Sequence, residues 1–287
     1  MSDCWADWIR TRRSGGDEET ARRMLAEVAV FRDRVLDNAQ LTGGETLVDV
    51  GCGNGLIGFE ALERGVGNVV FADVSGPLLD DCRELASQAG LLDRCRFLQA
   101  PADDLGALHS GSADVVTTRS VLIYVKDKAR AFAEFHRVLR PSGRISIFEP
   151  INRFGMDKRR CTWGYELDGE AAALMAKVTE FEGTFQGPDD PMLDFDERDL
   201  VALAEAAGFF PIQLDYAAAI RPLEPRKWGA TLHSSPNPKI PTLGEAMEQA
   251  LTPTELERLV AQLRPAIEEG RGVWRMGSAY LRAVKPG

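Results

Sequence analysis

The segment LVDVGCGNGLIGFEAL, residues 47–62, carries the densest set of residues that could bind a ligand. Gly51, Gly53 and Gly55 follow an apolar run typical of a buried strand, and a helical pattern follows them. Glycine permits a tight turn and lets the main chain approach a ligand closely, while the start of a helix offers free N–H groups. The pattern therefore predicts a ligand-binding turn between a strand and a helix.

The glycine spacing by itself fits two kinds of cofactor. Gly53, Gly55 and Gly58 match the G-x-G-x-x-G fingerprint of dinucleotide sites, and Asp73 ends the next β-rich run, where an acid that binds ribose is expected. Asp49 lies two residues before the first glycine. A carboxylate at that place suits a cationic amino group better than a pyrophosphate.

The elements around this turn alternate between strand and helix patterns. The β-rich runs are ETLVDV, VVFADV, RCRFLQA, ADVVTTRS and RISIFEP, and the helical patterns cover residues 56–64, 76–89 and 127–139. This alternation predicts βαβ units and a mostly parallel sheet with both faces covered. A helix is expected before them at residues 17–39.

The alternation loosens after Pro150 and returns late in the chain. Helices are expected at residues 169–181, in DERDLVALAEAAGF and in a stretch that ends near residue 269; strands are expected near residues 212–216 and in VWRMGSAYLRAV. A proline-rich loop, RPLEPRKWGATLHSSPNPKIP, lies between them. Its position suggests a cover over the ligand-binding edge of the sheet.

Three segments together resemble the class I S-adenosylmethionine (SAM) dependent methyltransferases. DVGCGNG echoes the family's D-x-G-x-G-x-G loop, Asp73 its acidic second strand end, and LRPSG its L-x-P-G-G turn, with Ser142 as a departure. The resemblance covers about residues 30–150. It implies an α/β fold: a Rossmann-like, doubly wound, mostly parallel sheet of seven strands, with helices on both faces and an inserted helical cover.

The resemblance also implies a domain division and a cofactor site. Residues 1–40 would form an N-terminal helical arm or lid, and residues 41–287 the methyltransferase domain, with cover insertions at about 151–190 and 221–272. The glycines would contact the methionyl part of SAM, Asp49 its ammonium group and Asp73 its ribose hydroxyls. The full expected set is Asp49, Gly51, Cys52, Gly53, Gly55, Asp73, Val74, Ala102, Asp103 and Arg119.

Adenine recognition is where this chain departs from the family. The family often has an acidic residue just before the alanine of LQAPADDL, but this chain has Pro101 there. Recognition could pass to Asp103 and the main chain of Ala102. The alternative is that Asp103 merely begins a helix.

Two residues are candidates for the chemistry of methyl transfer, which needs an aligned nucleophile more than a catalytic group. Tyr124 follows the fourth strand and could orient the substrate or merely pack. His233, in the proline-rich loop, could act as a general base. SAM would be the cofactor, S-adenosylhomocysteine (SAH) the product, and no metal is expected.

Basic and aromatic residues suggest where a substrate binds. Residues 144–160 carry five Lys or Arg against two acids, and Arg12 lies near Trp8 in the N-terminal arm. Arg pairs bidentately with carboxylates, so an acceptor that carries a carboxylate is one hypothesis; the alternative is that these charges are simply solvated. The expected substrate residues are Trp8, Arg12, Arg153, Arg159 and Trp228.

Composition narrows the function class. The chain has 34 Lys and Arg against 44 Asp and Glu, for a net charge of −10, which disfavours nucleic-acid binding. Its five cysteines form no C-x-x-C pair, and it has no apolar run long enough to span a membrane, so we expect a cytoplasmic protein without membrane contact. The oligomeric state stays open.

We therefore expect a SAM-dependent methyltransferase of natural-product type that methylates a small molecule or peptide on oxygen. Three alternatives remain at this point: an N- or C-methyltransferase, an NAD-dependent oxidoreductase, and a SAM-binding protein that has been repurposed for other chemistry.

Overall fold

The computed structural model describes residues 3–155, 163–187 and 189–287. They divide into two compact units, each described by itself below. The first, here the sheet unit, comprises Glu27–Ile151, Pro191–Ala217 and Ser278–Gly287; the second, the helical unit, comprises Met1–Ala26, Asn152–Asp190 and Ala218–Gly277.

A seven-stranded sheet organises the fold. Its strands are β1 (Thr46–Val50), β2 (Asn68–Asp73), β3 (Cys95–Gln99), β4 (Ala113–Arg119), β5 (Leu139–Pro150), β6 (Ile212–Pro222) and β7 (Val273–Val284), in the order β3-β2-β1-β4-β5-β7-β6. The first five strands are mutually parallel, and β7 runs antiparallel to β5. The expected seven strands are confirmed; the sheet is mixed because of β7.

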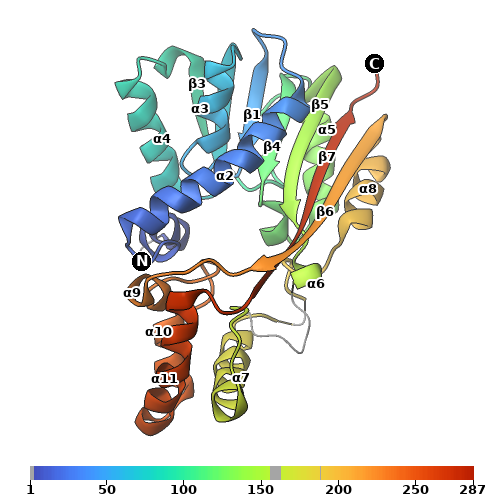
Figure 1. Ribbon diagram of the computed structural model, residues 1–287. Helices are drawn as coiled ribbons and strands as arrows, with labels where there is room; N and C mark the ends of the chain where they lie inside the picture. Colours follow the sequence, from blue (N-terminus) through green and yellow to red (C-terminus); the bar gives the residue numbers. More distant parts are fainter. Residues whose placement is uncertain (1–2, 156–162, 188) are drawn as a thin grey trace. The chain divides into compact units, whose positions relative to one another are not determined.

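Helices cover both faces of the sheet. Figure 1 shows α2 (Glu18–Ala39) crossing in front of the strands, while α5 (Lys128–Val138) and α8 (Glu197–Ala206) lie behind them. The remaining helices here are α3 (Leu56–Glu63), α4 (Gly76–Gln88) and two short 3₁₀ turns, η2 (Leu92–Arg94) and η3 (Leu122–Tyr124).

The side chains of β1 alternate between the two faces of the sheet, and both faces are buried under helices. Val48 and Val50 pack in one core cluster with Phe132 and Phe135 of α5. The residue between them, Asp49, points to the other face because successive side chains of a strand point to opposite faces, and there it accepts a hydrogen bond from α3.

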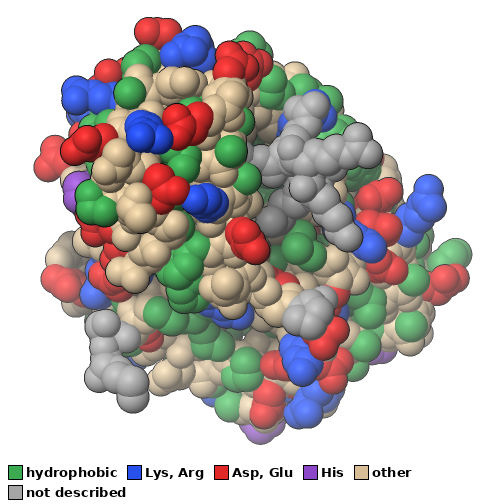
Figure 2. All heavy atoms as spheres, turned by 90° about the horizontal axis from the view of Figure 1, so that it is seen from below, with side chains coloured by type: hydrophobic (Ala, Val, Ile, Leu, Met, Phe, Trp, Pro, Cys, Tyr) green, Lys and Arg blue, Asp and Glu red, His purple; other side chains and the backbone are tan. Residues whose placement is uncertain are grey.

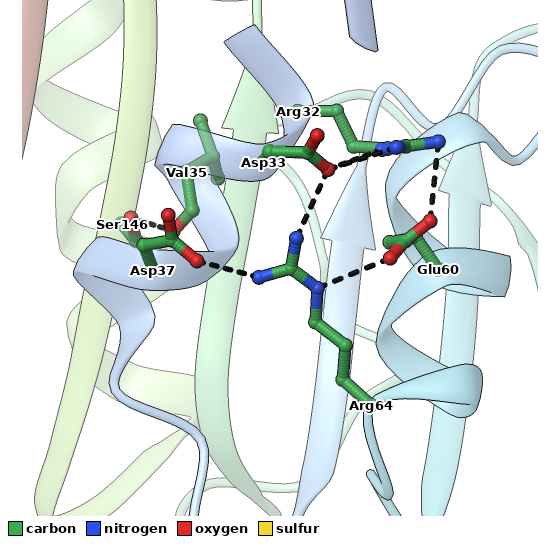
Figure 3. A network of polar contacts seen from close by, with 7 residues as sticks. All are labelled: Arg32, Asp33, Val35, Asp37, Glu60, Arg64 and Ser146. Atoms are coloured by element: carbon green, nitrogen blue, oxygen red, sulfur yellow. Dashed lines mark hydrogen bonds and ion pairs between the residues drawn. The ribbon is translucent and has the colours of Figure 1, made fainter. Parts of the chain in front are cut away.

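Charged side chains join α2 to α3 (Figure 3). Arg64 contacts Asp37 at 2.6 Å, Asp33 at 2.9 Å and Glu60 at 3.2 Å. Arg32 reaches Glu60 at 3.1 Å. An exposed pair contributes little alone, but a network with shared partners fixes how the two helices lie against each other.

The helical unit has its own apolar core. It contains α1 (Cys4–Asp7), the π-helix η1 (Trp8–Arg12), α6 (Asn152–Gly155), α7 (Gly169–Gly183), α9 (Trp228–Leu232), α10 (Leu243–Ala250) and α11 (Pro253–Glu269). Leu174 and Val178 of α7 pack with Met247 of α10 and Leu263 of α11. Capping boxes at Thr242–Glu245 and Thr252–Glu255 start α10 and α11.

Most of the elements expected from the sequence are confirmed; VWRMGSAYLRAV, for example, forms β7 from end to end. Three details differ from expectation. The strand expected near residues 212–216 continues to Pro222, the proline-rich loop contains the short helix α9, and β5 begins at Leu139, so that it includes the Pro141–Gly143 turn. Among the described residues, none of the helices is both long and apolar enough to cross a membrane.

Candidate cofactor site

The glycine turn lies where the order of the strands reverses. It follows β1, which has β2 on one side and β4 on the other, and ligands of open α/β sheets bind outside the carboxyl ends of the strands at such a point. Gly51, Gly53 and Gly55 have φ values of 65°, 55° and 81°. Residues other than glycine rarely adopt this left-handed region, so the expected turn between strand and helix is confirmed, while its binding of a ligand stays a prediction.

Packing adds a second demand at Gly51. A methyl group built there would overlap the side chain of Val121, which follows β4. The N–H groups of Gly51 and Cys52 both donate to the carbonyl of Ala72, at 2.7 and 3.1 Å. The turn is therefore held between β2 and the segment that follows β4.

Asp73, at the end of β2, fixes the middle of the turn. Its Oδ2 accepts the N–H of Gly53 at 2.8 Å, and its Oδ1 accepts the N–H of Ser75 at 2.9 Å. Val74, beside it, is 45% exposed and leaves apolar surface next to the acid.

Asp49 holds the start of α3. It is 2% exposed, and it accepts hydrogen bonds from the N–H of Gly58 at 3.1 Å and from the hydroxyl of Thr117 at 3.2 Å. Burial raises its pKa to about 7. These contacts favour a role in positioning the turn, and its contact with an ammonium group stays a prediction.

Glu149, at the end of β5, is a part of this edge that the sequence analysis missed. Its Oε1 accepts the N–H groups of Val121 at 2.9 Å and Leu122 at 3.0 Å, and its Oε2 accepts that of Ile123 at 3.3 Å. Burial raises its pKa to about 7. The signal was available: an acid ends the β-rich run RISIFEP, at the edge of the sheet where ligands bind.

This carboxylate holds the turn that presses Val121 against Gly51. Ser120, just before it, has a φ of 56°, and its N–H donates to the carbonyl of Phe148 at 2.9 Å. Glu149 thus shapes the glycine turn indirectly, through one packed side chain.

The other expected cofactor residues also lie in the sheet unit. Ala102 is buried, and Asp103 follows it in a turn; no helix begins there, so that alternative is wrong. Arg119 ends β4, and its charge lowers the pKa of both Asp49 and Glu149, although burial outweighs it. All ten expected residues therefore lie at or just after the carboxyl ends of β1, β2, β3 and β4.

The two catalytic candidates fall in different units. Tyr124 is the last residue of η3 and is half-buried against the core of the sheet unit. His233 ends α9 in the helical unit, where its Nδ1 lies 2.8 Å from the carbonyl of Gly229.

The residues expected to bind substrate, as far as the structure describes them, lie in the helical unit. Trp8 donates its indole N–H to the carbonyl of Ser235 at 3.0 Å, Trp228 begins α9, and Arg153 belongs to α6. Arg159 lies outside the described residues.

Arg12 and His233 are brought together. They line one surface pocket of about 590 Å³, which also includes Thr242 and Glu248. The guanidinium of Arg12 pairs with Glu245 at 2.7 Å in this pocket. The sequence analysis gave no signal for these acidic neighbours.

Figure 2 gives a space-filling view in which acidic and basic side chains are interleaved on the visible surface. Among the described residues, no group of three or more His, Cys, Asp or Glu could hold a metal ion.

Known proteins share the part of the chain that builds this site. Residues 48–147 match a family model described as a methyltransferase domain. A ubiquinone biosynthesis O-methyltransferase from Psychrobacter arcticus is 34% identical over 110 residues, which are 38% of this chain and 42% of that protein. A nocamycin O-methyltransferase from Saccharothrix syringae is 36% identical over 120 residues, 41% of this chain and 42% of the other. The chain thus matches less than half the length of these curated relatives.

The fold similarity extends further. A solved structure of geranyl diphosphate methyltransferase in complex with SAM covers 94% of this chain and 92% of its own, with 18% identity and a TM-score of 0.54. Residues 48–147 are therefore similar to methyltransferase domains, and the chain shares the fold of this methyltransferase structure.

Proposed function

We propose that this protein transfers the methyl group of SAM to an oxygen of a small molecule or peptide. The observation that carries the proposal is the hydrogen bond from Gly53 to Asp73, which places a left-handed glycine turn and a carboxylate side by side at the carboxyl ends of β1 and β2. A ligand at this edge would meet main-chain N–H groups and an acid together.

The residues at the edge fit SAM. Asp73, which binds the glycine turn and Ser75, would also bind the ribose hydroxyls, and Val74 would offer its exposed apolar side chain to adenine. The glycine turn would contact the methionyl chain. SAM, when bound, supplies a methyl group already activated on a sulfonium sulfur. Asp49 and Glu149 keep the turn in place, which is positioning rather than bond making.

Positioning can account for most of the acceleration. Alignment of two reactants contributes up to about 7–11 kcal/mol, whereas a general base adds about 10²–10⁴-fold and only for an acceptor that carries a proton of high pKa. Tyr124 follows β4 at the cofactor edge and would orient the acceptor. His233 would serve as the base if the acceptor is a hydroxyl.

Oxygen is the proposed acceptor atom, and a carboxylate is one form of it. The O-methyltransferases among the relatives support oxygen, and the nocamycin enzyme supports a role in natural-product biosynthesis. Arg12 and Arg153, with Arg159, would bind an anionic acceptor, and Trp8 and Trp228 would supply apolar surface. We propose the arm at 1–40 and the insertions at about 151–190 and 221–272 as a cover, which protection from proteolysis by SAH would test.

Titration calorimetry and label transfer test the proposal in two steps. We expect SAH to bind with a micromolar or lower Kd and NADH to give no heat; binding of NADH without SAH would contradict the proposal. A labelled methyl group should then pass from SAM to an acceptor in a cell extract. Binding of SAH without any transfer would identify a repurposed SAM-binding protein, and mass spectrometry of the product would separate O- from N- and C-methylation.

A further inference from the structure

The last strand of the sheet, β6, has a free edge. In the described chain its only strand neighbour is β7, and the order of the sheet ends with it. All eight residues from Asp215 to Pro222 are exposed, on both faces of the strand. A long edge strand presents unpaired N–H and C=O groups that can pair with another strand, and natural proteins usually shorten, bend or cover such an edge.

The sequence of this edge is complementary to itself. Residues 215–221 read Asp-Tyr-Ala-Ala-Ala-Ile-Arg, with an acid at one end, a base at the other and three alanines in the middle. Two copies laid antiparallel with Ala218 opposite Ala218 place Asp215 opposite Arg221 twice. The same register places Tyr216 opposite Ile220 twice. Directly opposite residues in an antiparallel pair share a face and interact most strongly.

The two pairings fall on different faces of the strand. Asp215 and Arg221 differ by an even number of positions and share one face, whereas Tyr216 and Ile220 share the other. The apolar pair is left partly uncovered in a single chain, with Tyr216 38% and Ile220 57% exposed. A second copy would therefore cover an apolar cross-strand pair on one face and form two ion pairs on the other.

The charged ends are already held in position. Arg34 pairs with Asp215 at 3.1 Å, and the guanidinium of Arg221 lies 4.3 Å from the centre of the Trp274 ring. Since Asp215 keeps 48% of its side chain exposed, it can accept a second cation. Less side-chain freedom is lost on association when the charges are already oriented.

We propose that the protein forms a symmetric dimer in which β6 pairs antiparallel with β6 of a second copy, with the two-fold axis at Ala218. Such an interface is isologous: each contact occurs twice, and the surface is complementary to itself. The charge pattern favours a second copy because the same segment, laid antiparallel, supplies both the base opposite Asp215 and the acid opposite Arg221. The proposal is independent of the reaction that the protein catalyses.

Cross-linking tests the register. In Ala218→Cys the two new thiols would face each other across the axis, at a separation that a disulfide can span. We expect mild oxidation to convert most of the variant to a covalent dimer, while the parent chain, which carries the exposed Cys4, stays below a few per cent. Cys introduced at Gln213, an exposed position off the axis, should not cross-link.

Charge reversal tests the partner. Asp215→Arg and Arg221→Asp should each weaken the dimer at least tenfold in sedimentation equilibrium, because like charges then face each other. Mixing the two variants should restore a heterodimer, since each charge then meets its opposite. Each variant alone changes only exposed side chains, so both should keep the far-ultraviolet circular dichroism of the parent.

Three results would overturn the proposal: a parent chain that is monomeric at 100 µM, a dimer that neither variant weakens, or variants that do not recover on mixing. A dimer with unchanged affinity in both variants would place the interface elsewhere. Pairing of β6 with an unrelated peptide but not with itself would identify a different occupant.

Discussion

Two buried carboxylates, one in each unit, show how differently the units use polar groups. Glu149 and Glu182 are both at most 2% exposed, and burial raises the pKa of each to about 7. Glu149 accepts three main-chain N–H groups, from Val121, Leu122 and Ile123. Glu182 accepts one indole N–H, from Trp163 at 2.9 Å, and its Oε2 has no hydrogen-bond partner among the described residues.

Glu149 fixes the conformation of a loop, whereas Glu182 does not. The partners of Glu149 are consecutive amides of a turn, so the acid fixes main-chain geometry beside the glycine turn. The partner of Glu182 is the side chain of Trp163, so this contact holds no main-chain N–H group. A buried acid therefore holds the main chain beside the candidate cofactor site in one unit and a single side-chain contact in the other.

The largest effect is expected from Gly51→Ala. The new methyl group would meet Val121, whose branched side chain has little freedom to move, in a backbone region that alanine disfavours. We expect SAH affinity to fall about 1000-fold, or about 4 kcal/mol, by calorimetry. Gly90→Ala is the matched control, with a similar φ of 68° and open space around it. Equal loss in both variants would mean that the loss of SAH affinity does not come from the Val121 contact.

The next largest effect concerns stability against pH. A buried acid whose pKa rises from 4.5 to about 7 on folding stabilises the native state below pH 4.5, and this contribution is lost as pH rises through 7. Glu149→Gln and Glu182→Gln should each remove up to about 3 kcal/mol of the fall between pH 5 and 8, measured by urea unfolding. Unchanged slopes in both variants would contradict the raised pKa values.

Glu149→Gln and Glu182→Gln should have similar effects on stability but different effects on SAH affinity. Glu149→Gln puts an amide NH₂ against a main-chain N–H of the turn, which should loosen Val121 and weaken SAH binding about tenfold, or about 1.4 kcal/mol. Glu182→Gln should leave SAH affinity within a factor of two. If both variants bind equally well, Glu149 has no positioning role.

The smallest effect is expected at a helix cap of the helical unit. The Thr252 hydroxyl accepts the N–H of Glu255 at the start of α11. Thr252→Ala should lower the free energy of unfolding by about 1 kcal/mol without changing SAH affinity, whereas Thr252→Ser should retain the cap. A loss of SAH binding in Thr252→Ala alone would show that the unit stabilises the cofactor edge.

Much of the sheet unit could be predicted from the chain. The alternation of runs located the elements from β1 to β5, and the final run gave β7 from end to end. The short helix α9 was missed because prolines at positions 222, 225, 236 and 238 surround a single helical turn. The full length of β6 was missed because three consecutive alanines carry no period-two pattern.

Only part of the candidate site could be predicted from the sequence, because some of its contacts join segments that are distant in the chain. The turn at Gly51, Gly53 and Gly55 could be predicted, because a left-handed backbone conformation favours glycine and is therefore visible in the residue types. The position of Glu149 at the end of a β-rich run could be read from the sequence, but its partners could not, because they lie 26 to 28 residues earlier in the chain and meet it only through the pairing of β4 with β5.

What the sequence determined by itself is therefore local: the turn, the helices and strands around it, and the acid at the end of β2. What the tertiary structure decided is which acids are buried and which groups they hold, Asp49 under α3 and Glu149 under the turn after β4. The physical reason is that a backbone conformation is encoded within a few neighbouring residues, whereas burial and hydrogen-bond partners arise only when distant segments pack together.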